Sequence, residues 1–95
     1  MPVSRVAVMA DYYAFPLWSG GERGGMLSPD ALPLRAPLRE DLARWSDDYT
    51  QTLLANGCAW PDEQARIDLN TRGRALAVRV ADELGPSYEV KFGEC

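Results

Sequence analysis

The sequence predicts an α+β fold in which a two-helix hairpin packs on a small sheet formed by the N- and C-terminal strands, in the order β-loop-α-α-β. Apolar residues alternate near the N-terminus and again near the C-terminus, which is the period of a strand. Between these segments, apolar residues recur twice at helical spacing, and Pro and Gly mark the boundaries. A chain of 95 residues buries one modest core, so we expect a single domain over residues 1–95.

Residues 3–13 are predicted to form the first strand, because alternate side chains of an extended chain point to opposite faces. One face carries Val6, Val8, Ala10 and Tyr12. The other face carries Ala7, Met9 and Asp11. Both faces are fairly apolar, so we expect helices to cover one of them and another part of the protein to cover the second.

Residues 15–37 are predicted to form a long connection without regular structure. This segment contains Pro16, Pro29, Pro33, Pro37, Gly20, Gly21, Gly24 and Gly25. Proline and glycine at this density block helices and strands, and a connection of this length is usually functional or partly disordered. The glycine-rich part lacks the Lys-Ser/Thr pair and the following helix of a phosphate-binding loop, so it does not predict a nucleotide site.

Residues 37–55 are predicted to form the first helix. Its apolar stripe consists of Leu38, Leu42, Trp45, Tyr49 and Leu53. Spacings of four, three, four and four residues place these side chains on one helix face. Asn56 and Gly57, which both tolerate positive φ, end the helix.

Residues 61–84 are predicted to form the second helix, with Pro61 at its start and Gly85-Pro86 after its end. Its stripe consists of Leu69, Gly73, Leu76, Val80 and Leu84. We expect this stripe to meet the stripe of the first helix. Glycine inside a helix costs about 1 kcal/mol relative to alanine. Close approach of another backbone would explain Gly73, and so would a tolerated glycine or a break near Asn70-Thr71.

Residues 87–92 alternate well and are predicted to form the last strand. Tyr88, Val90 and Phe92 are expected to point inward, and Glu89 and Lys91 outward. Two strands alone make a marginal sheet, and their open edges invite pairing with another chain. We therefore expect either a homodimer that extends the sheet or capture of a strand from a partner protein.

The composition argues against several classes of chemistry. There is no histidine, and Cys58 and Cys95 are too few for a disulfide scaffold or a four-ligand zinc site. We therefore predict no catalytic residues, no metal and no cofactor. A net charge of −4 with intermixed arginines and acids argues against nucleic-acid binding. No apolar run approaches the roughly 18–20 residues that span a bilayer, so we expect no membrane association and a cytoplasmic location.

The residues predicted to bind a partner are Asp11, Tyr12, Tyr13, Trp18, Glu22 and Arg23. They crowd aromatic and charged side chains at the end of the first strand, and aromatic residues dominate interface hot spots. The aromatics could instead seal the edge of the core, and the two interpretations can coexist. Asp47 and Asp48 are expected to form a solvated helix face, and the arginines of the second helix are expected to pair with acids of the same helix.

The leading functional hypothesis is a small acidic protein-interaction module, best described as an immunity-type or antitoxin-type inhibitor that is not an enzyme. It would bind a protein partner, and its acidity would favour a basic one. The alternative is a small-molecule-binding or enzymatic domain that uses the region of Tyr12 and Tyr13. A dimeric regulatory subunit is a third option. Buried polar groups converging at the loop would favour the alternative, whereas an aromatic patch ringed by acids would favour the inhibitor.

The order of several short segments resembles a group of small, uncharacterised actinobacterial proteins. These segments are Phe15-Pro16-Leu17-Trp18, Leu32-Pro33-Leu34, Leu38…Leu42…Trp45…Tyr49, Gly73-Arg74-Ala75-Leu76-Ala77 and Glu83-Leu84-Gly85-Pro86. The resemblance covers most of the chain. The group has no assigned activity, so the resemblance implies no functional residues.

Overall fold

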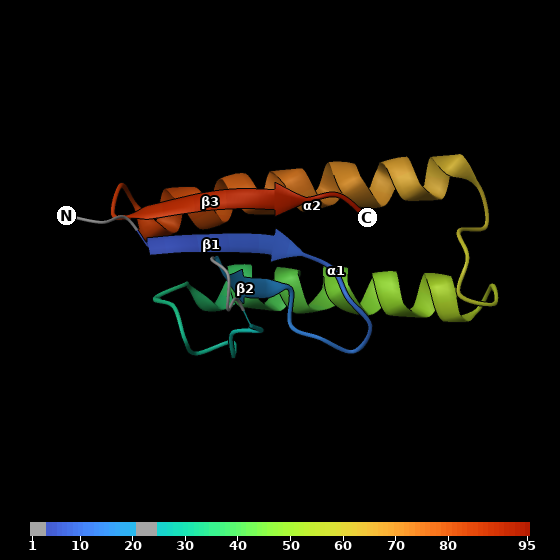
Figure 1. Cartoon of the computed structure of the whole chain (residues 1–95), viewed down its shortest axis with the longest axis horizontal. Coiled ribbons are helices and arrows are strands. Elements are labelled where there is room, and N and C mark those ends of the chain that lie inside the picture. The colour runs from blue at the N-terminus through green and yellow to red at the C-terminus, as the bar shows by residue number, and fades with distance from the viewer. Residues whose placement is uncertain (1–3, 21–24) are drawn as a thin grey trace.

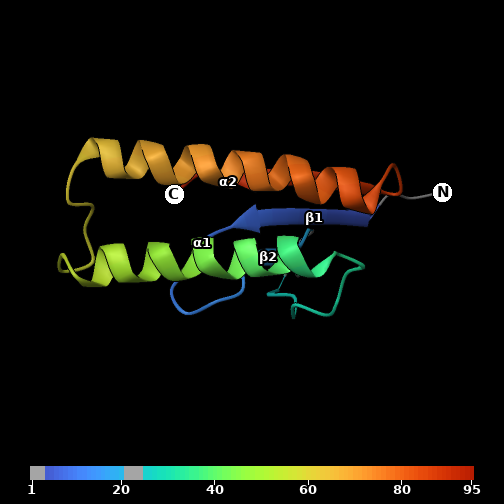
Figure 2. The same cartoon turned by 180° about the vertical axis from the view of Figure 1, so that it is seen from behind.

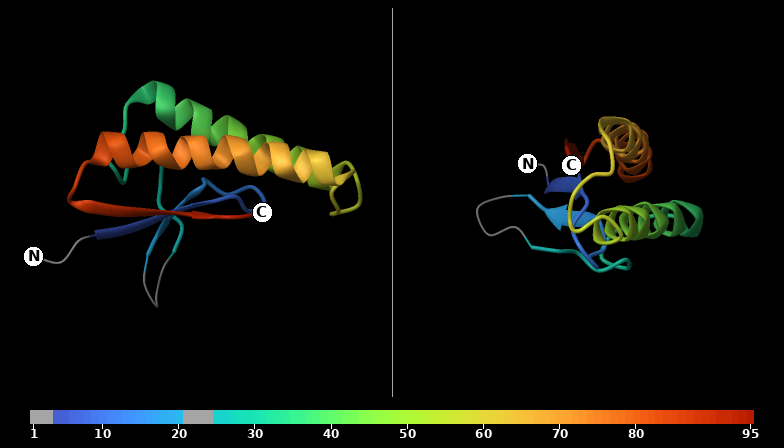
Figure 3. Two further views of the ribbon diagram at one scale, coloured as in Figure 1. Left: turned by 90° about the horizontal axis from the view of Figure 1, so that it is seen from above. Right: turned by 90° about the vertical axis from the view of Figure 1, so that its right-hand side faces the viewer.

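The computed structural model describes residues 4–20 and 25–95. Their elements, in chain order, are β1 (Ser4–Met9), β2 (Leu17–Ser19), α1 (Ala36–Leu54), α2 (Glu63–Leu84) and β3 (Tyr88–Gly93). Both helices lie on one face of the sheet, and the hairpin runs along the strands (Figures 1 and 3). This arrangement confirms the predicted α+β class and the two-helix hairpin.

The sheet has the order β2-β1-β3. β1 and β3 are parallel, with Val6 opposite Val90 and Val8 opposite Phe92, as expected of strands joined by a helical crossover (Figure 1). The predicted inward residues of β3 therefore share a face with the buried valines of β1. The first strand ends at Met9, earlier than predicted, because the chain turns immediately after it.

A third strand, β2, was not predicted. Leu17–Ser19 pairs antiparallel with β1, inside the segment that was expected to be a long connection. Three residues after a proline are too few to show a period, so the sequence gives little signal here. Gly25 O accepts a hydrogen bond from Ser19 N (2.9 Å) and Leu27 N donates one to Leu17 O (2.7 Å), so residues 25–27 pair with the outer edge of β2.

The outer edge of β3 has no partner strand among the described residues. Among the described strands, β3 therefore offers the free edge at which a homodimer or a captured strand could extend the sheet. Both of these modes of association remain predictions. In the described part of the chain, neither helix combines the length and the apolar character needed to cross a membrane.

The two helices lie side by side over one face of the sheet (Figure 2). Buried residues of both predicted stripes join those of the sheet in one core. Trp45 is fully buried, and its indole Nε1 donates a hydrogen bond to Leu69 O of α2 at 2.8 Å. Its ring centroid lies 6.1 Å from that of Phe92 on β3. Trp45 thus joins the three elements α1, α2 and β3 at one point.

The ends of α2 follow the sequence signals closely. Asp62 is the N-cap, and its side-chain oxygen accepts a hydrogen bond from Ala65 N at 2.7 Å. Gly85 follows the last turn with φ of 77°, in the region that favours glycine. The helix begins at Glu63, two residues after the predicted start at Pro61, because Asp62 takes the capping position.

Gly73 lies where α2 passes closest to aromatic side chains, and no helix break occurs there. A Cβ atom at this position would lie 2.5 Å from Trp45 Cζ2 and closer still to Phe92 Cε1. The close approach that could explain this glycine is therefore made by side chains, and not by another backbone.

We expect Gly73→Ala to destabilise the protein, although alanine is the better helix former by about 1 kcal/mol. Trp45 is fully buried and cannot move away, so overpacking should cost about 1–3 kcal/mol in the free energy of unfolding. Urea unfolding measures this change. Thr71→Ala, at an exposed position of the same helix, is the matched control and should change stability by only a few tenths of a kcal/mol. Equal or higher stability of Gly73→Ala would contradict this account of the packing.

Candidate interaction surface

The chain turns sharply between β1 and β2. Ala14 N donates to Asp11 O at 3.3 Å, and the Asp11 side chain accepts from Tyr12 N at 2.8 Å. Aspartate commonly starts turns in this way. Tyr13 has φ of 54°, a left-handed conformation that costs a residue with a side chain about 1–2 kcal/mol.

Two hydroxyl groups of α1 hold this turn in place. Thr50 Oγ1 accepts a hydrogen bond from Tyr13 N at 3.1 Å, and Ser46 Oγ donates one to Ala14 O. Both side chains are polar, yet they are almost fully buried in an otherwise apolar region. A buried hydroxyl is costly unless it is hydrogen-bonded, so these contacts explain why α1 carries polar residues at both positions.

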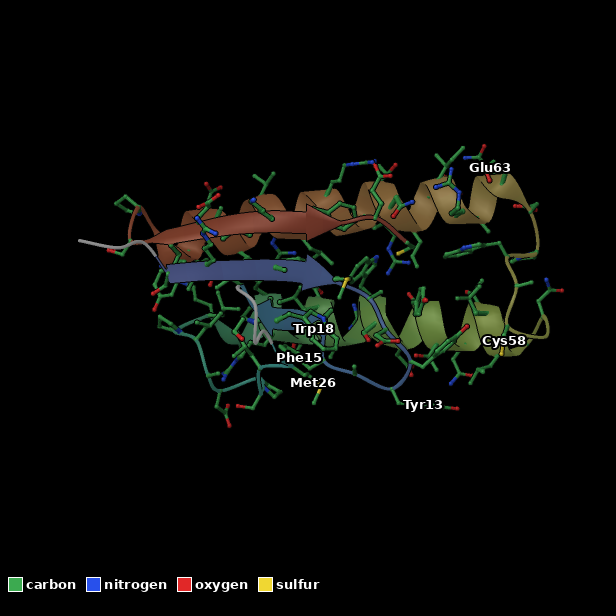
Figure 4. All side chains as sticks on the ribbon, in the orientation of Figure 1. Tyr13, Phe15, Trp18, Met26, Cys58 and Glu63 are labelled. Atoms are coloured by element: carbon green, nitrogen blue, oxygen red, sulfur yellow. The ribbon has the colours of Figure 1, made fainter. Side chains whose placement is uncertain are left out.

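The turn presents Tyr13 to solvent. Its side chain is 80% exposed and points away from the body of the protein (Figure 4). An exposed ring adds little to the core, so burial of the ring does not offset the free-energy cost of the left-handed backbone conformation. Backbone outliers of this kind concentrate at functional sites, which favours a binding role for Tyr13.

Tyr12 has a different environment. Its ring centroid lies 5.5 Å from that of Tyr49 on α1, which in turn lies 5.9 Å from that of Trp60 in the interhelical connection. Desolvation raises the pKa of Tyr12 above its ordinary value, and the adjacent Cys58 adds to this rise. Tyr12 thus belongs mainly to an aromatic row that fastens the turn to the helices, as expected of residues that seal the edge of the core.

Trp18 lies on another face of the molecule. Its neighbour Leu17 is fully buried under the helices, so the alternation of β2 places Trp18 on the opposite face of the sheet. The Trp18 indole donates to Met9 O at 2.9 Å, and the backbone pairs with that of Met26, whose side chain is 54% exposed.

The six predicted binding residues are therefore not brought together as one cluster. Tyr13 lies at the exposed turn with Asp11 beside it, Tyr12 is packed against α1, and Trp18 is on the far face of the sheet. Glu22 and Arg23 lie outside the described residues.

Tyr13 borders a shallow hollow of about 300 Å³, which opens onto α1. The hollow is lined by Tyr13, Ala14, Phe15, Ala43, Ser46 and Asp47. A second hollow of about 330 Å³ adjoins it and shares Phe15 and Ala43. Its further lining residues are Pro29, Asp30, Ala36, Arg39 and Glu40. We refer to Tyr13, Phe15, Glu40, Ala43 and Asp47 as the Tyr13 surface.

Sequence reasoning missed the contribution of α1 to this surface. Asp47 was expected to belong to a plain solvated face, yet it lines the hollow beside Tyr13. The spacing of residues 36, 40, 43 and 47 could have indicated this, since it places them on one helix face. These four positions hold alanine and acidic residues in alternation.

The arginines of α2 were expected to pair with acids of the same helix, but most of them pair with acids of other parts of the chain. Arg72 contacts Asp48 of α1 at 2.8 Å, Arg79 contacts Asp41 of α1 at 2.6 Å, and Arg74 pairs with Glu94. Only Arg66 has an intrahelical partner, Glu63. The hydrogen bond from Arg79 lowers the pKa of the Asp41 carboxyl. The Arg79–Asp41 pair and Arg72 line a groove between the two helices, which has a volume of about 280 Å³.

Buried polar groups converge near Tyr13, but their hydrogen-bonding capacity is used internally. Ser46 and Thr50 bind the backbone of the turn. Across residues 4–20 and 25–95, no buried side-chain nitrogen or oxygen lacks a hydrogen-bond partner, and no group of potential metal ligands occurs. The described residues thus lack the buried polar groups with free hydrogen-bonding capacity that would favour a small-molecule site. They do include an exposed aromatic residue bordered by acids.

Comparison with known proteins supplies the family. The family model described as Serratia CdiI immunity protein-like matches residues 4–94. No curated protein matches the sequence. Because the match extends over nearly the entire chain, the protein belongs to the Serratia CdiI immunity protein-like family and is an immunity-type inhibitor.

Proposed function

We propose that this protein confers immunity by binding a toxin protein directly, without any enzymatic step, and that the Tyr13 surface forms the contact. Membership of an immunity protein family carries the first part of the proposal, because immunity requires that a toxin be recognised. The exposed, left-handed Tyr13 carries the second part.

The Tyr13 surface has the features of an interaction hot spot. Tyrosine supplies a large contact area with few rotatable bonds, and hot spots are rich in this residue. The turn is fastened to α1 by Ser46 and Thr50, so little conformational entropy is lost when a partner binds. Acidic side chains at Glu40 and Asp47 lie beside the aromatic residues and add charge complementarity to the contact.

A growth experiment tests the function. The tagged protein is used to capture its partner from a native lysate, and the captured protein is then expressed alone in a sensitive host. We expect growth to be arrested, and we expect co-expression of this protein to restore it.

Val78→Ala changes an exposed apolar residue of α2 and serves as the control variant, which should protect as well as the parent. A captured protein that does not harm the host, or a toxic one against which this chain gives no protection, would contradict the proposal. Recovery of a bound small molecule in place of a protein would favour the alternative of a small-molecule-binding domain.

A further inference from the structure

The exposed flank of α1 alternates small and acidic residues. Ala36, Glu40, Ala43 and Asp47 follow one another at spacings of four, three and four, so they form a single stripe along the helix. These four residues line the two adjoining hollows, which share part of their lining and so form one trough. Arg39 and Asp30 also line the trough, but they pair with each other at 3.2 Å, so the charge left uncompensated along it is negative.

The charges of the trough are available to a partner. Among the described residues, neither Glu40 nor Asp47 lies within ion-pair distance of a basic side chain. Their sequence neighbours Asp41 and Asp48 are instead paired with arginines of α2. One side of α1 thus uses its acids to hold the hairpin together, while the other side leaves its acids unpaired.

Aromatic rings complete the trough. Phe15 lines both hollows, and Tyr13 lines the same hollow as Asp47. Arginine and lysine bury their aliphatic stems on apolar surface and place their charges over aromatic rings or beside carboxylates. This combination of ring, small residue and unpaired acid is complementary to basic side chains.

We propose that the trough binds a basic segment of the partner protein, with one cationic side chain beside Glu40 and a second beside Asp47. These acids are seven positions apart in the helix, which corresponds to about 10.5 Å along the helix axis. Two cations three residues apart in a polyproline II segment lie on the same side and about 9 Å apart, so such a segment fits the trough. The inference rests on the proposed function only in that it takes the partner to be a toxin.

A defined peptide tests this inference without the toxin. The ¹⁵N-labelled protein is titrated with acetyl-Arg-Pro-Pro-Arg-amide, and amide shifts are followed by NMR. We expect shifts confined to the turn around Tyr13 and to the stripe on α1, and we expect them to weaken as salt is added. The peptide acetyl-Glu-Pro-Pro-Glu-amide should leave these amides unchanged.

Two matched variants decide the assignment. Glu40→Gln combined with Asp47→Asn should weaken binding of the basic peptide about fivefold or more, because two exposed ion pairs are lost. Asp68→Asn combined with Asp82→Asn removes the same charge from α2 and should change binding less than about twofold. Shifts spread over all acidic surfaces, equal weakening in both double variants, or no shift at all would overturn the inference. None of these outcomes bears on growth protection, so the failure of this inference and the failure of the proposed function are distinguishable.

Discussion

Replacing Trp45 with alanine is expected to leave the protein unfolded or nearly so at 25 °C. The side chain is fully buried, and it contacts both α2 and β3. Truncation of a buried tryptophan costs about 3–5 kcal/mol. A domain of this size sits near the lower end of the usual stability range of about 5–15 kcal/mol, so little stability would remain.

Thermal and urea unfolding measure this loss. For a domain of this length, each kcal/mol lowers the melting temperature by about 4–8 °C, so a fall of at least about 12 °C is expected if Trp45→Ala folds at all. Trp45→Phe keeps an aromatic ring but removes the hydrogen bond to Leu69, and it should fold with a smaller loss of about 1–2 kcal/mol.

Asp48→Ala is the control on the same helix. Its pair with Arg72 is about half exposed, so removal should cost less than about 1 kcal/mol. A parent-like melting midpoint for Trp45→Ala would mean that the helix hairpin is not held together as described.

The helices were predictable because their signals agree with one another. In both helices the apolar period and the flanking Pro and Gly point to the same boundaries, although no side chain caps the start of α1. Gly85 shows this most clearly, since it has the positive φ expected of the residue after the last turn of α2. Asp62, which was predicted to lie inside the first turn, is instead the N-cap. The strand β2 was not predictable, because three residues cannot display a period and their pairing is set by β1.

The arrangement of the candidate site was predictable only in part. The aromatic residues were predicted to form one cluster, but sequence alone could not divide them among three environments. The division depends on the turn after Met9, which directs Tyr12 toward α1 and Tyr13 outward, and on the alternation of β2, which directs Trp18 to the other face of the sheet. The contribution of Glu40 and Asp47 depends on Phe15, distant in the sequence, lining the same hollows, which no local pattern reveals.

A separate prediction bears on the energetics of recognition. We expect Tyr13→Ala to weaken binding to the captured toxin by about 2 kcal/mol or more, which is about a 30-fold rise in Kd, because central aromatic residues carry a large share of interface energy. Surface plasmon resonance with the purified pair measures both rate constants. The loss should appear mainly in the dissociation rate, since Tyr13 carries no charge that would guide encounter.

Three further variants show whether Tyr13 acts through contact or through stability. Tyr13→Gly relieves the left-handed backbone and should be no less stable than the parent, yet it should bind as weakly as Tyr13→Ala. Asp11→Asn keeps an acceptor for Tyr12 N and should chiefly slow association and flatten its salt dependence. Trp18→Ala alters the opposite face of the sheet and should leave Kd within about threefold of the parent if the Tyr13 surface is the contact. A larger effect of Trp18→Ala than of Tyr13→Ala would move the interface to the open face of the sheet, whereas loss of folding in Tyr13→Gly would assign Tyr13 a structural role.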